Sequence, residues 1–293
     1  MAQPTPQKKL NSIVLVPTDF SEACGNAVSH GVKLARFLGY KVCILHVINN
    51  ETKAALKKKN VGVDYVEWRL KEYKKYYEKK YEVPIDTMAE EGSIFTTITE
   101  VAVKIKANLM ILGTHGKKGL QHVFGSYALK VISESPVPVL VVQKRSFREG
   151  YKNIILPVNN DLEPRQAVPW AKLMVKLFHA EVNLFLSQEN DSALNHRVLI
   201  ITKQITDIFD EEKVAYTVTH AEKPGGFAEQ VISHGIMKHT DLILMITRPN
   251  MDVPGFSLSA WSERLMFNEA QIPVMCINPV DYGYYYYEWI TLT

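Results

Sequence analysis

Short apolar runs alternate with longer amphipathic stretches in the first half of the chain. Runs rich in Val, Ile and Leu predict buried strands at residues 12–17, 41–47, 85–90, 108–112 and 137–142. Helical spacing is found between them, at residues 27–38, 51–82, 94–107 and 127–132. The long charged segment at 51–82 carries one apolar stripe, formed by Val66, Leu70, Tyr73 and Tyr77. This order of elements predicts an α/β fold with a doubly wound, parallel, five-stranded sheet.

The second half of the chain repeats this pattern. At a shift of 140 residues Pro157 falls on Pro17, and at a shift of 135 residues Ile272–Ile277 falls on Val137–Val142. A tandem duplication is the simplest account. We therefore predict two domains, at residues 1–147 and 148–293, with the linker in the polar segment that contains Gly150.

Composition indicates a globular protein. The chain has 293 residues, 46% of them hydrophobic and 22% charged, which suits two domains that each bury a core. Cys24, Cys43 and Cys276 form no C-x-x-C pair, so a reducing compartment is favoured over a disulfide framework. No apolar run has the length of a membrane span, and the N-terminus has no signal-peptide pattern. We expect a cytoplasmic protein with no membrane partner.

Charge is unevenly divided between the two halves. Residues 1–147 contain 22 Lys and Arg against 13 Asp and Glu, a balance of +9, and residues 148–293 have −6, which together give the net charge of +3. Lysines and tyrosines interleave in the segment at 71–77, as they do in platforms for single-stranded nucleic acid. The glutamates among them favour a solvated amphipathic helix instead, so we expect no nucleic-acid partner.

A glycine-rich loop runs from Gly113 to Ser126, between a predicted strand and a predicted helix. The first turn of a helix offers unpaired N–H groups and the positive end of the helix dipole, and glycines let an anion approach the backbone. Gly125 and Ser126 precede the helix predicted to start at Tyr127, so Ser126 is either a plain N-cap or an N-cap that also contacts a phosphate. The loop matches neither the G-x-x-x-x-G-K-[ST] phosphate loop nor the G-x-G-x-x-G fingerprint.

Asp19 lies just past the first predicted strand, on the side where open α/β sheets bind ligands. Its carboxylate either binds the backbone of its own loop and caps the next helix, or contacts a ligand. Single histidines such as His46 have no partner at a diagnostic spacing, and we expect them to be structural or surface residues. His115 and His122 lack Cys or carboxylate neighbours, so no metal site is expected.

The sequence supports no catalytic assignment. We find no nucleophile elbow and no motif that gives Ser126 a base. In the second half the glycines of the loop are replaced: at the shift of 135, Gly113, Gly116, Gly125 and Ser126 become Arg248, Met251, Ala260 and Trp261. We therefore expect the second domain to be degenerate and not to bind a ligand in the same way.

Three features together resemble the universal stress protein family. They are the segment Val16–Glu22 after the first strand, the Gly-x-x-Gly at Gly113 and Gly116 with the later Gly125-Ser126, and the Pro-Val-Pro-Val-Leu-Val-Val of the last strand. The family loop has nine residues before the Gly-Ser pair where this chain has eight. The resemblance covers both halves as a tandem pair and implies a Rossmann-like fold of the adenine nucleotide alpha hydrolase-like type.

The resemblance also implies an adenine nucleotide, ATP or AMP, with or without Mg²⁺. Pro17, Thr18 and Asp19 would lie at the base and ribose, and the backbone of Val47 would bind adenine. The residues implied around the ribose and phosphates are Gly113, Thr114, His115, Gly116, Gly125, Ser126 and Tyr127. It further implies that the two halves form an internal pseudo-dimer through their last strands, and a homodimer is a further expectation.

Three functions are compatible with these features. The leading hypothesis is a nucleotide-binding protein for stress sensing or signalling, with one competent site in the first half. The alternatives are a slow Mg²⁺-dependent ATPase and a protein-interaction scaffold that binds no nucleotide. The aromatic tail at residues 281–293 is expected to fold back or to pack between subunits.

Overall fold

The computed structural model describes residues 12–114, 122–160, 164–247 and 258–279, with the backbone alone at 122–127. The chain divides into two compact units, Met1–Arg148 and Glu149–Thr293, where the sequence predicted a boundary between residues 147 and 148. The aromatic tail lies outside the described residues, and so do His115 and Gly116. None of the helices in the described ranges has the length and apolar character needed to cross a membrane.

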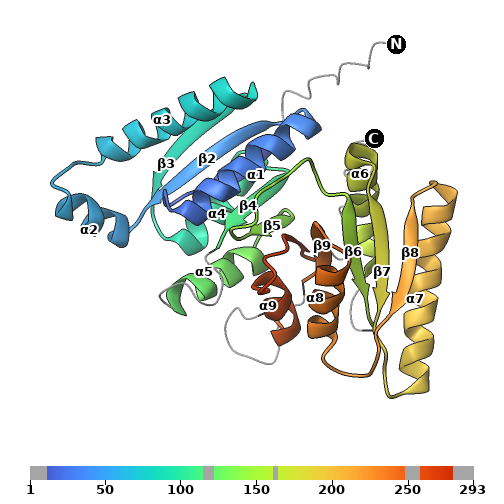
Figure 1. Cartoon of the computed structure of the whole chain (residues 1–293). Helices are drawn as coiled ribbons and strands as arrows, with labels where there is room; N and C mark the ends of the chain where they lie inside the picture. Colours follow the sequence, from blue (N-terminus) through green and yellow to red (C-terminus); the bar gives the residue numbers. More distant parts are fainter. Residues whose placement is uncertain (1–11, 115–121, 161–163, 248–257, 280–293) are drawn as a thin grey trace, which may run out of the picture. The chain divides into compact units, whose positions relative to one another are not determined.

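The first unit is a parallel sheet covered by helices (Figure 1). Its strands run in the order β3-β2-β1-β4-β5. Their bounds are β1 Ile13–Pro17, β2 Lys41–Ile48, β3 Ile85–Glu91, β4 Leu109–Gly113 and β5 Val139–Val142. All four pairings are parallel, with Val14 opposite Val42 on one side and Leu109 on the other. The predicted α/β fold with a doubly wound parallel sheet is confirmed.

The helices of this unit form two layers. They are α1 Glu22–Leu38, α2 Asn50–Lys58, α3 Asp64–Tyr81, α4 Ile94–Lys104 and α5 His122–Ser133. Helices α1 and α3 contact each other, and so do α4 and α5, as right-handed crossovers on the two sides of β1 require. Leu15, Ile44 and Ile111 lie between the layers with no exposed surface. This burial on both faces explains why the strands read as continuous apolar runs.

Two helices of the first unit begin earlier than predicted. Helix α1 starts at Glu22 because the hydroxyl of Ser21 accepts the N–H of Cys24 and caps it. Helix α5 starts at His122, so Gly125 and Ser126 lie inside the helix and the prediction that Ser126 is its N-cap is wrong. The sequence placed the start of this helix after Gly125 and Ser126. A single glycine within a helix costs only about 1 kcal/mol, so Gly125 does not have to mark its start.

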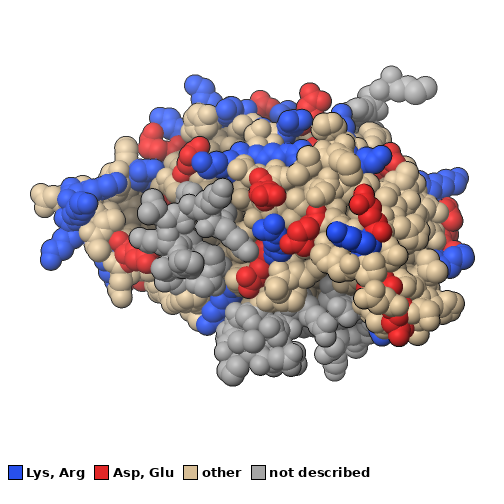
Figure 2. Space-filling view, turned by 60° about the horizontal axis from the view of Figure 1, so that its bottom comes forward, with Lys and Arg blue, Asp and Glu red and all other residues tan. Residues whose placement is uncertain are grey.

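The long charged region is divided into α2 and α3 at Asn60, whose φ is 54°. Of the four residues of the stripe predicted on α3, Val66, Leu70 and Tyr77 are buried and Tyr73 is only partly buried. Acidic partners offset some of the lysines, as in the ion pairs Lys53–Glu91 (2.7 Å) and Lys74–Glu78 (3.8 Å). On the face drawn in Figure 2, charges of both signs are interspersed.

The second unit repeats the fold of the first, with strand order β10-β9-β6-β7-β8. Its strands are β6 Asn153–Val158, β7 Glu181–Leu186, β8 Tyr216–His220, β9 Leu242–Ile246 and β10 Val274–Ile277. Its helices are the 3-10 helix η1 Pro164–Ala167, α6 Val168–Phe178, α7 Ser192–Glu211, α8 Phe227–Met237 and α9 Ala260–Met266. The pairing predicted between the last strands of the two halves stays a prediction.

The two fourth strands align at a shift of 133 residues, not at the 135 used on the sequence. The N–H of Thr114 bonds to the carbonyl of Val142 at 2.8 Å, and the N–H of Thr247 bonds to that of Ile277 at 2.9 Å. Thr247 therefore corresponds to Thr114, and Ile246 rather than Arg248 corresponds to Gly113. The alignment by sequence was two residues off, because the connection from the fourth to the fifth strand is two residues longer in the second unit. Only the ladder of backbone hydrogen bonds fixes the register.

Candidate functional site

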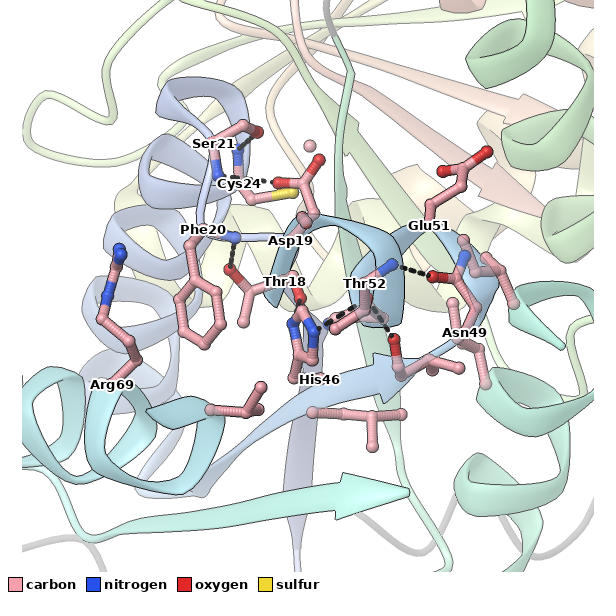
Figure 3. A pocket seen from close by; sticks show the side chains of 18 of the residues that line it. Thr18, Asp19, Phe20, Ser21, Cys24, His46, Asn49, Glu51, Thr52 and Arg69 are labelled. Atoms are coloured by element: carbon pink, nitrogen blue, oxygen red, sulfur yellow. Dashed lines mark hydrogen bonds between the residues drawn. The ribbon is translucent and has the colours of Figure 1, made fainter. Parts of the chain in front are cut away.

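A cavity of about 430 Å³ lies at the carboxyl ends of β1, β2 and β4 in the first unit (Figure 3). This volume is within the usual range for small-molecule sites. Side chains from α1, α2, α3, α4 and α5 complete its walls. Of the site residues predicted from the sequence, the structure brings six to this cavity: Pro17, Thr18, Asp19, Val47, Gly113 and Thr114.

The turn between β1 and α1 is held by side chains that bind its own backbone. The Thr18 hydroxyl accepts the N–H of Phe20 at 3.0 Å, and the Asp19 carboxylate accepts the N–H of Ser21 at 2.7 Å. Phe20 has a φ of 64°, a conformation that is costly for a bulky side chain and that these two bonds stabilise. The structure thus confirms that Asp19 binds its own loop, and its contact with a ligand stays a prediction.

His46 is a cavity residue, where the sequence led us to expect a structural histidine. It is buried at the end of β2, and its ring stacks on Phe20 with centroids 4.7 Å apart. The guanidinium of Arg69 lies 4.5 Å from the Phe20 ring centroid, so Phe20 is in contact with both. Burial lowers the pKa of His46, although its bond to the Thr18 carbonyl and the charge of Asp19 oppose this effect. The ring is therefore neutral at pH 7.

A chain of hydrogen bonds leads from His46 to the end of β2. Nδ1 of His46 lies 2.7 Å from the Thr18 carbonyl, and Nε2 lies 3.3 Å from the Thr52 hydroxyl. The same hydroxyl lies 3.3 Å from the carbonyl of Val47, which also accepts the N–H of Asn49 at 3.1 Å. The Asn49 side chain caps α2 by accepting the N–H of Thr52 at 2.8 Å. The carbonyl of Val47, whose backbone the family resemblance assigns to adenine, is thus bonded within the chain.

Thr114 has an unsatisfied hydroxyl on the cavity wall. The residue is only 8% exposed, and its Oγ1 has no hydrogen-bond partner among the residues that the structure describes. A buried hydroxyl without a partner is costly, and in native proteins such groups commonly mark a place that a ligand or water satisfies. Thr114 is therefore the wall residue whose chemistry most directly indicates a polar ligand.

Gly113 is explained by packing. A Cβ at this position would lie 2.4 Å from the carbonyl oxygen of Ala23, in the first turn of α1, and 2.9 Å from the N of Cys24. The end of β4 can approach α1 only where no side chain intervenes. The glycine thus serves the fit of strand against helix, and the sequence could not separate that need from the approach of a ligand.

Cys24 also lines the cavity. Burial and the neighbouring Asp19 carboxylate raise the pKa of its thiol to about 12. The thiol is protonated at neutral pH and is therefore a poor nucleophile. Within the described ranges, no group of three or more His, Cys, Asp or Glu side chains is arranged to hold a metal ion.

The glycine-rich loop is only partly described. His115 and Gly116 lie outside the described residues, while Gly125, Ser126 and Tyr127 lie in the N-terminal half of α5. Ala128 and Val131, further along α5, line the cavity, so this helix lies beside it.

Sequence reasoning missed several wall residues that carry polar or aromatic chemistry, among them Phe20, His46, Thr52 and Arg69. One signal was available for Arg69, which lies three residues after Val66 and four before Tyr73 and therefore borders the apolar stripe of α3. Thr52 had no comparable signal, because only the turn from β2 into α2 brings it back to Val47.

Residues 11–143 match the sequence model of the universal stress protein family. A universal stress protein of Methanocaldococcus jannaschii is 32% identical over 139 residues, which cover 45% of this chain and 81% of that protein. A second universal stress protein of the same organism is 26% identical over 159 residues, covering 45% of this chain and 95% of its own length. The crystal structure of a universal stress protein from Archaeoglobus fulgidus has the same fold, with a TM-score of 0.72 over 92% of this chain and 99% of its own, at 17% identity.

Proposed function

The chain belongs to the universal stress protein family, and on this premise we propose that its first unit binds an adenine nucleotide, ATP or AMP. The proposed role is sensing or signalling in a stress response, by holding the nucleotide rather than turning it over rapidly. One observation carries the proposal: a cavity of about 430 Å³ at the carboxyl edge of the sheet has the buried, unpartnered hydroxyl of Thr114 on its wall.

The cavity walls suit a nucleotide that lies across the carboxyl ends of the strands. Leu45, Ile94 and Ile98 supply an apolar surface for a base. The backbone of Val47 and the turn at Pro17, Thr18 and Asp19 supply polar groups near it. Crevices at this edge of open parallel sheets are where such folds bind ligands.

We assign the phosphates to the opposite wall, where β4 leads toward α5. Thr114 would donate its hydroxyl to the ribose or a phosphate, and the N-terminal half of α5 would add its dipole. His115, Gly116, Gly125, Ser126 and Tyr127 are the further contacts that we propose there. The nucleotide would be held either alone or together with Mg²⁺.

The test is to identify what the protein retains and then to titrate it. Native mass spectrometry of the purified full chain is expected to detect ATP or AMP, and calorimetry is expected to show saturable binding of at least one of them. Thr114→Val, which keeps the shape of the side chain, should weaken binding about fivefold, because it removes one hydrogen bond worth about 1 kcal/mol.

The other outcomes separate the alternatives. Phosphate release that requires Mg²⁺ and is lost in Gly116→Trp or Asp19→Ala would establish slow ATP hydrolysis. The absence of both retained and titratable nucleotide from the folded wild-type protein would overturn the proposal and favour an interaction scaffold.

A further inference from the structure

The hydroxyl of Thr52 has two acceptors and one proton. It lies 3.3 Å from Nε2 of His46 and 3.3 Å from the carbonyl oxygen of Val47 (Figure 3). A hydroxyl can donate to only one of them at a time. The backbone of Thr52 is fixed by the Asn49 cap, so rotation of the hydroxyl alone chooses between the two.

The tautomer of His46 is set by its other nitrogen. Nδ1 is 2.7 Å from the Thr18 carbonyl, which can only accept, so Nδ1 carries the proton. In the neutral ring Nε2 is then an acceptor and can receive the Thr52 hydroxyl. The stack of Phe20 on the ring, with centroids 4.7 Å apart and planes at 19°, holds the ring in this orientation.

The carbonyl of Val47 is the acceptor that the cavity offers at the end of β2. Its two lone pairs are taken by the N–H of Asn49 at 3.1 Å and by the Thr52 hydroxyl. A ligand that donates to this carbonyl must therefore displace the hydroxyl, because the bond from Asn49 belongs to the backbone turn. Nε2 of His46 can accept the displaced hydroxyl, so no buried donor is left without a partner.

We infer that Thr52 is a positioning residue for the base: its hydroxyl turns from the Val47 carbonyl to Nε2 of His46 when a base with an exocyclic amino group donates to that carbonyl. This inference rests on the proposed function and specifies the ligand class, since adenine has such an amino group. A 6-keto base such as hypoxanthine would direct an oxygen at the Val47 carbonyl. It would form no hydrogen bond there when the Thr52 hydroxyl rotates away.

Protonation of His46 prevents this rotation of the Thr52 hydroxyl. An imidazolium donates from both nitrogens, so Nε2–H takes the Thr52 oxygen as its acceptor and the hydroxyl proton stays on Val47. The charged groups that act on the ring are Asp19, in the turn after β1, and Arg69, on α3, while Thr52 faces it from α2. The amino-base ligand then loses its acceptor as the pH falls through the His46 titration.

The test compares ATP with ITP, which have the same triphosphate, in calorimetric titrations of the full chain from pH 8 to pH 5. In the wild type the ratio of ATP to ITP affinity should fall about three- to tenfold once His46 is protonated, as followed by NMR of its ring, the equivalent of one neutral hydrogen bond. Thr52→Val should hold this ratio constant within about twofold. Thr52→Ser, which keeps a hydroxyl at this position, should retain the dependence of the ratio on pH.

A ratio that falls equally in the wild type and Thr52→Val would overturn the inference and leave nucleotide binding intact. Failure of both nucleotides to bind the wild type would instead overturn the proposed function. Nitrogen NMR of the histidine rings needs no ligand: at pH 8 the Nδ1–H tautomer of His46 is expected, and an Nε2–H tautomer would refute the inference by itself. In Thr52→Val the His46 titration should shift, and an unchanged titration would also count against it.

Discussion

The two units place a threonine at the same point and use it differently. In the first unit the hydroxyl of Thr114 lies on the cavity wall and has no partner within the described part of the chain. In the second, the hydroxyl of Thr247 donates to the carbonyl of Ile277 at 3.2 Å and contacts the Asn278 side chain. The second unit therefore satisfies within its own chain a group that has no partner among the described residues of the first unit.

The residues near these two threonines also differ between the units, being aliphatic in the first and aromatic in the second. Leu45 of β2 and Ile94, the first residue of α4, line the cavity of the first unit. Their counterparts are Phe185 of β7 and Phe227, the first residue of α8. Those two rings stack with centroids 5.8 Å apart, and Trp261 of α9 stacks on Phe227 at 6.2 Å. Aromatic side chains thus stand at positions that correspond to aliphatic wall residues of the cavity.

This contrast separates what the fold needs from what a ligand needs. Both units build the same parallel sheet, so neither the open cavity nor the unpartnered hydroxyl is required for folding. Gly113 is different, because it admits the first turn of α1, whereas the second unit has Ile246 there and the 3-10 helix η1 ahead of α6. A glycine near a site is therefore weak evidence for a ligand until its neighbours are known.

Gly113→Ala should have the largest effect on stability. Its Cβ would meet the Ala23 backbone at 2.4 Å, and backbone cannot move aside cheaply, so we expect a loss of about 2 to 3 kcal/mol in urea unfolding. Gly25→Ala is the matched control, since no atom lies within 4 Å of its added Cβ and alanine favours the helix by about 1 kcal/mol. Equal stability of the two variants would contradict the packing role of Gly113.

His30 should make the first unit sensitive to acid. The ring is fully buried in α1 and lies 2.9 Å from the Arg145 carbonyl, and burial lowers its pKa to about 4 from an ordinary value of 6.5. The unfolded chain therefore binds the proton more tightly. Stability from this group is complete above pH 6.5 and is lost as the pH falls toward 4, by about 2 kcal/mol between pH 7 and pH 5.

The control for His30 is the variant His30→Gln, which can keep a donor toward the carbonyl but cannot titrate. The second unit has Trp170 at the corresponding position and lacks this contribution. Urea unfolding at both pH values should show a smaller acid loss for the variant than for the wild type. The same loss in both would refute the assignment.

The two threonines should give the smallest effects, of opposite sign. Thr247→Val removes the bond to Ile277 and leaves the Asn278 side chain without that contact, so we expect a loss of about 1 kcal/mol in chemical unfolding. Thr114→Val removes an unsatisfied hydroxyl and should leave the ligand-free protein equally stable or slightly more stable. A clear destabilisation by Thr114→Val would show that its hydroxyl has a partner in the folded chain.

Much of the fold could be predicted from the local spacing of apolar residues. The strands at Ile13–Pro17 and Lys41–Ile48 and the stripe of Val66, Leu70 and Tyr77 follow from residues close together in sequence. Starts of helices were less accurate, because the Ser21 cap and the interior position of Gly125 depend on a few backbone bonds that apolar spacing does not report.

By itself the sequence determined the class of the protein: a duplicated α/β chain whose first half places Pro17, Thr18, Asp19, Val47, Gly113 and Thr114 at one edge of a parallel sheet. It could do so because the carboxyl ends of parallel strands meet at that edge whatever the side chains are. Only the tertiary structure decided that Gly113 serves α1, that the Thr114 hydroxyl has no partner among the described residues, and that Thr52 lies between His46 and Val47. Those facts depend on distances of 2 to 4 Å between groups from different elements, which no local pattern encodes.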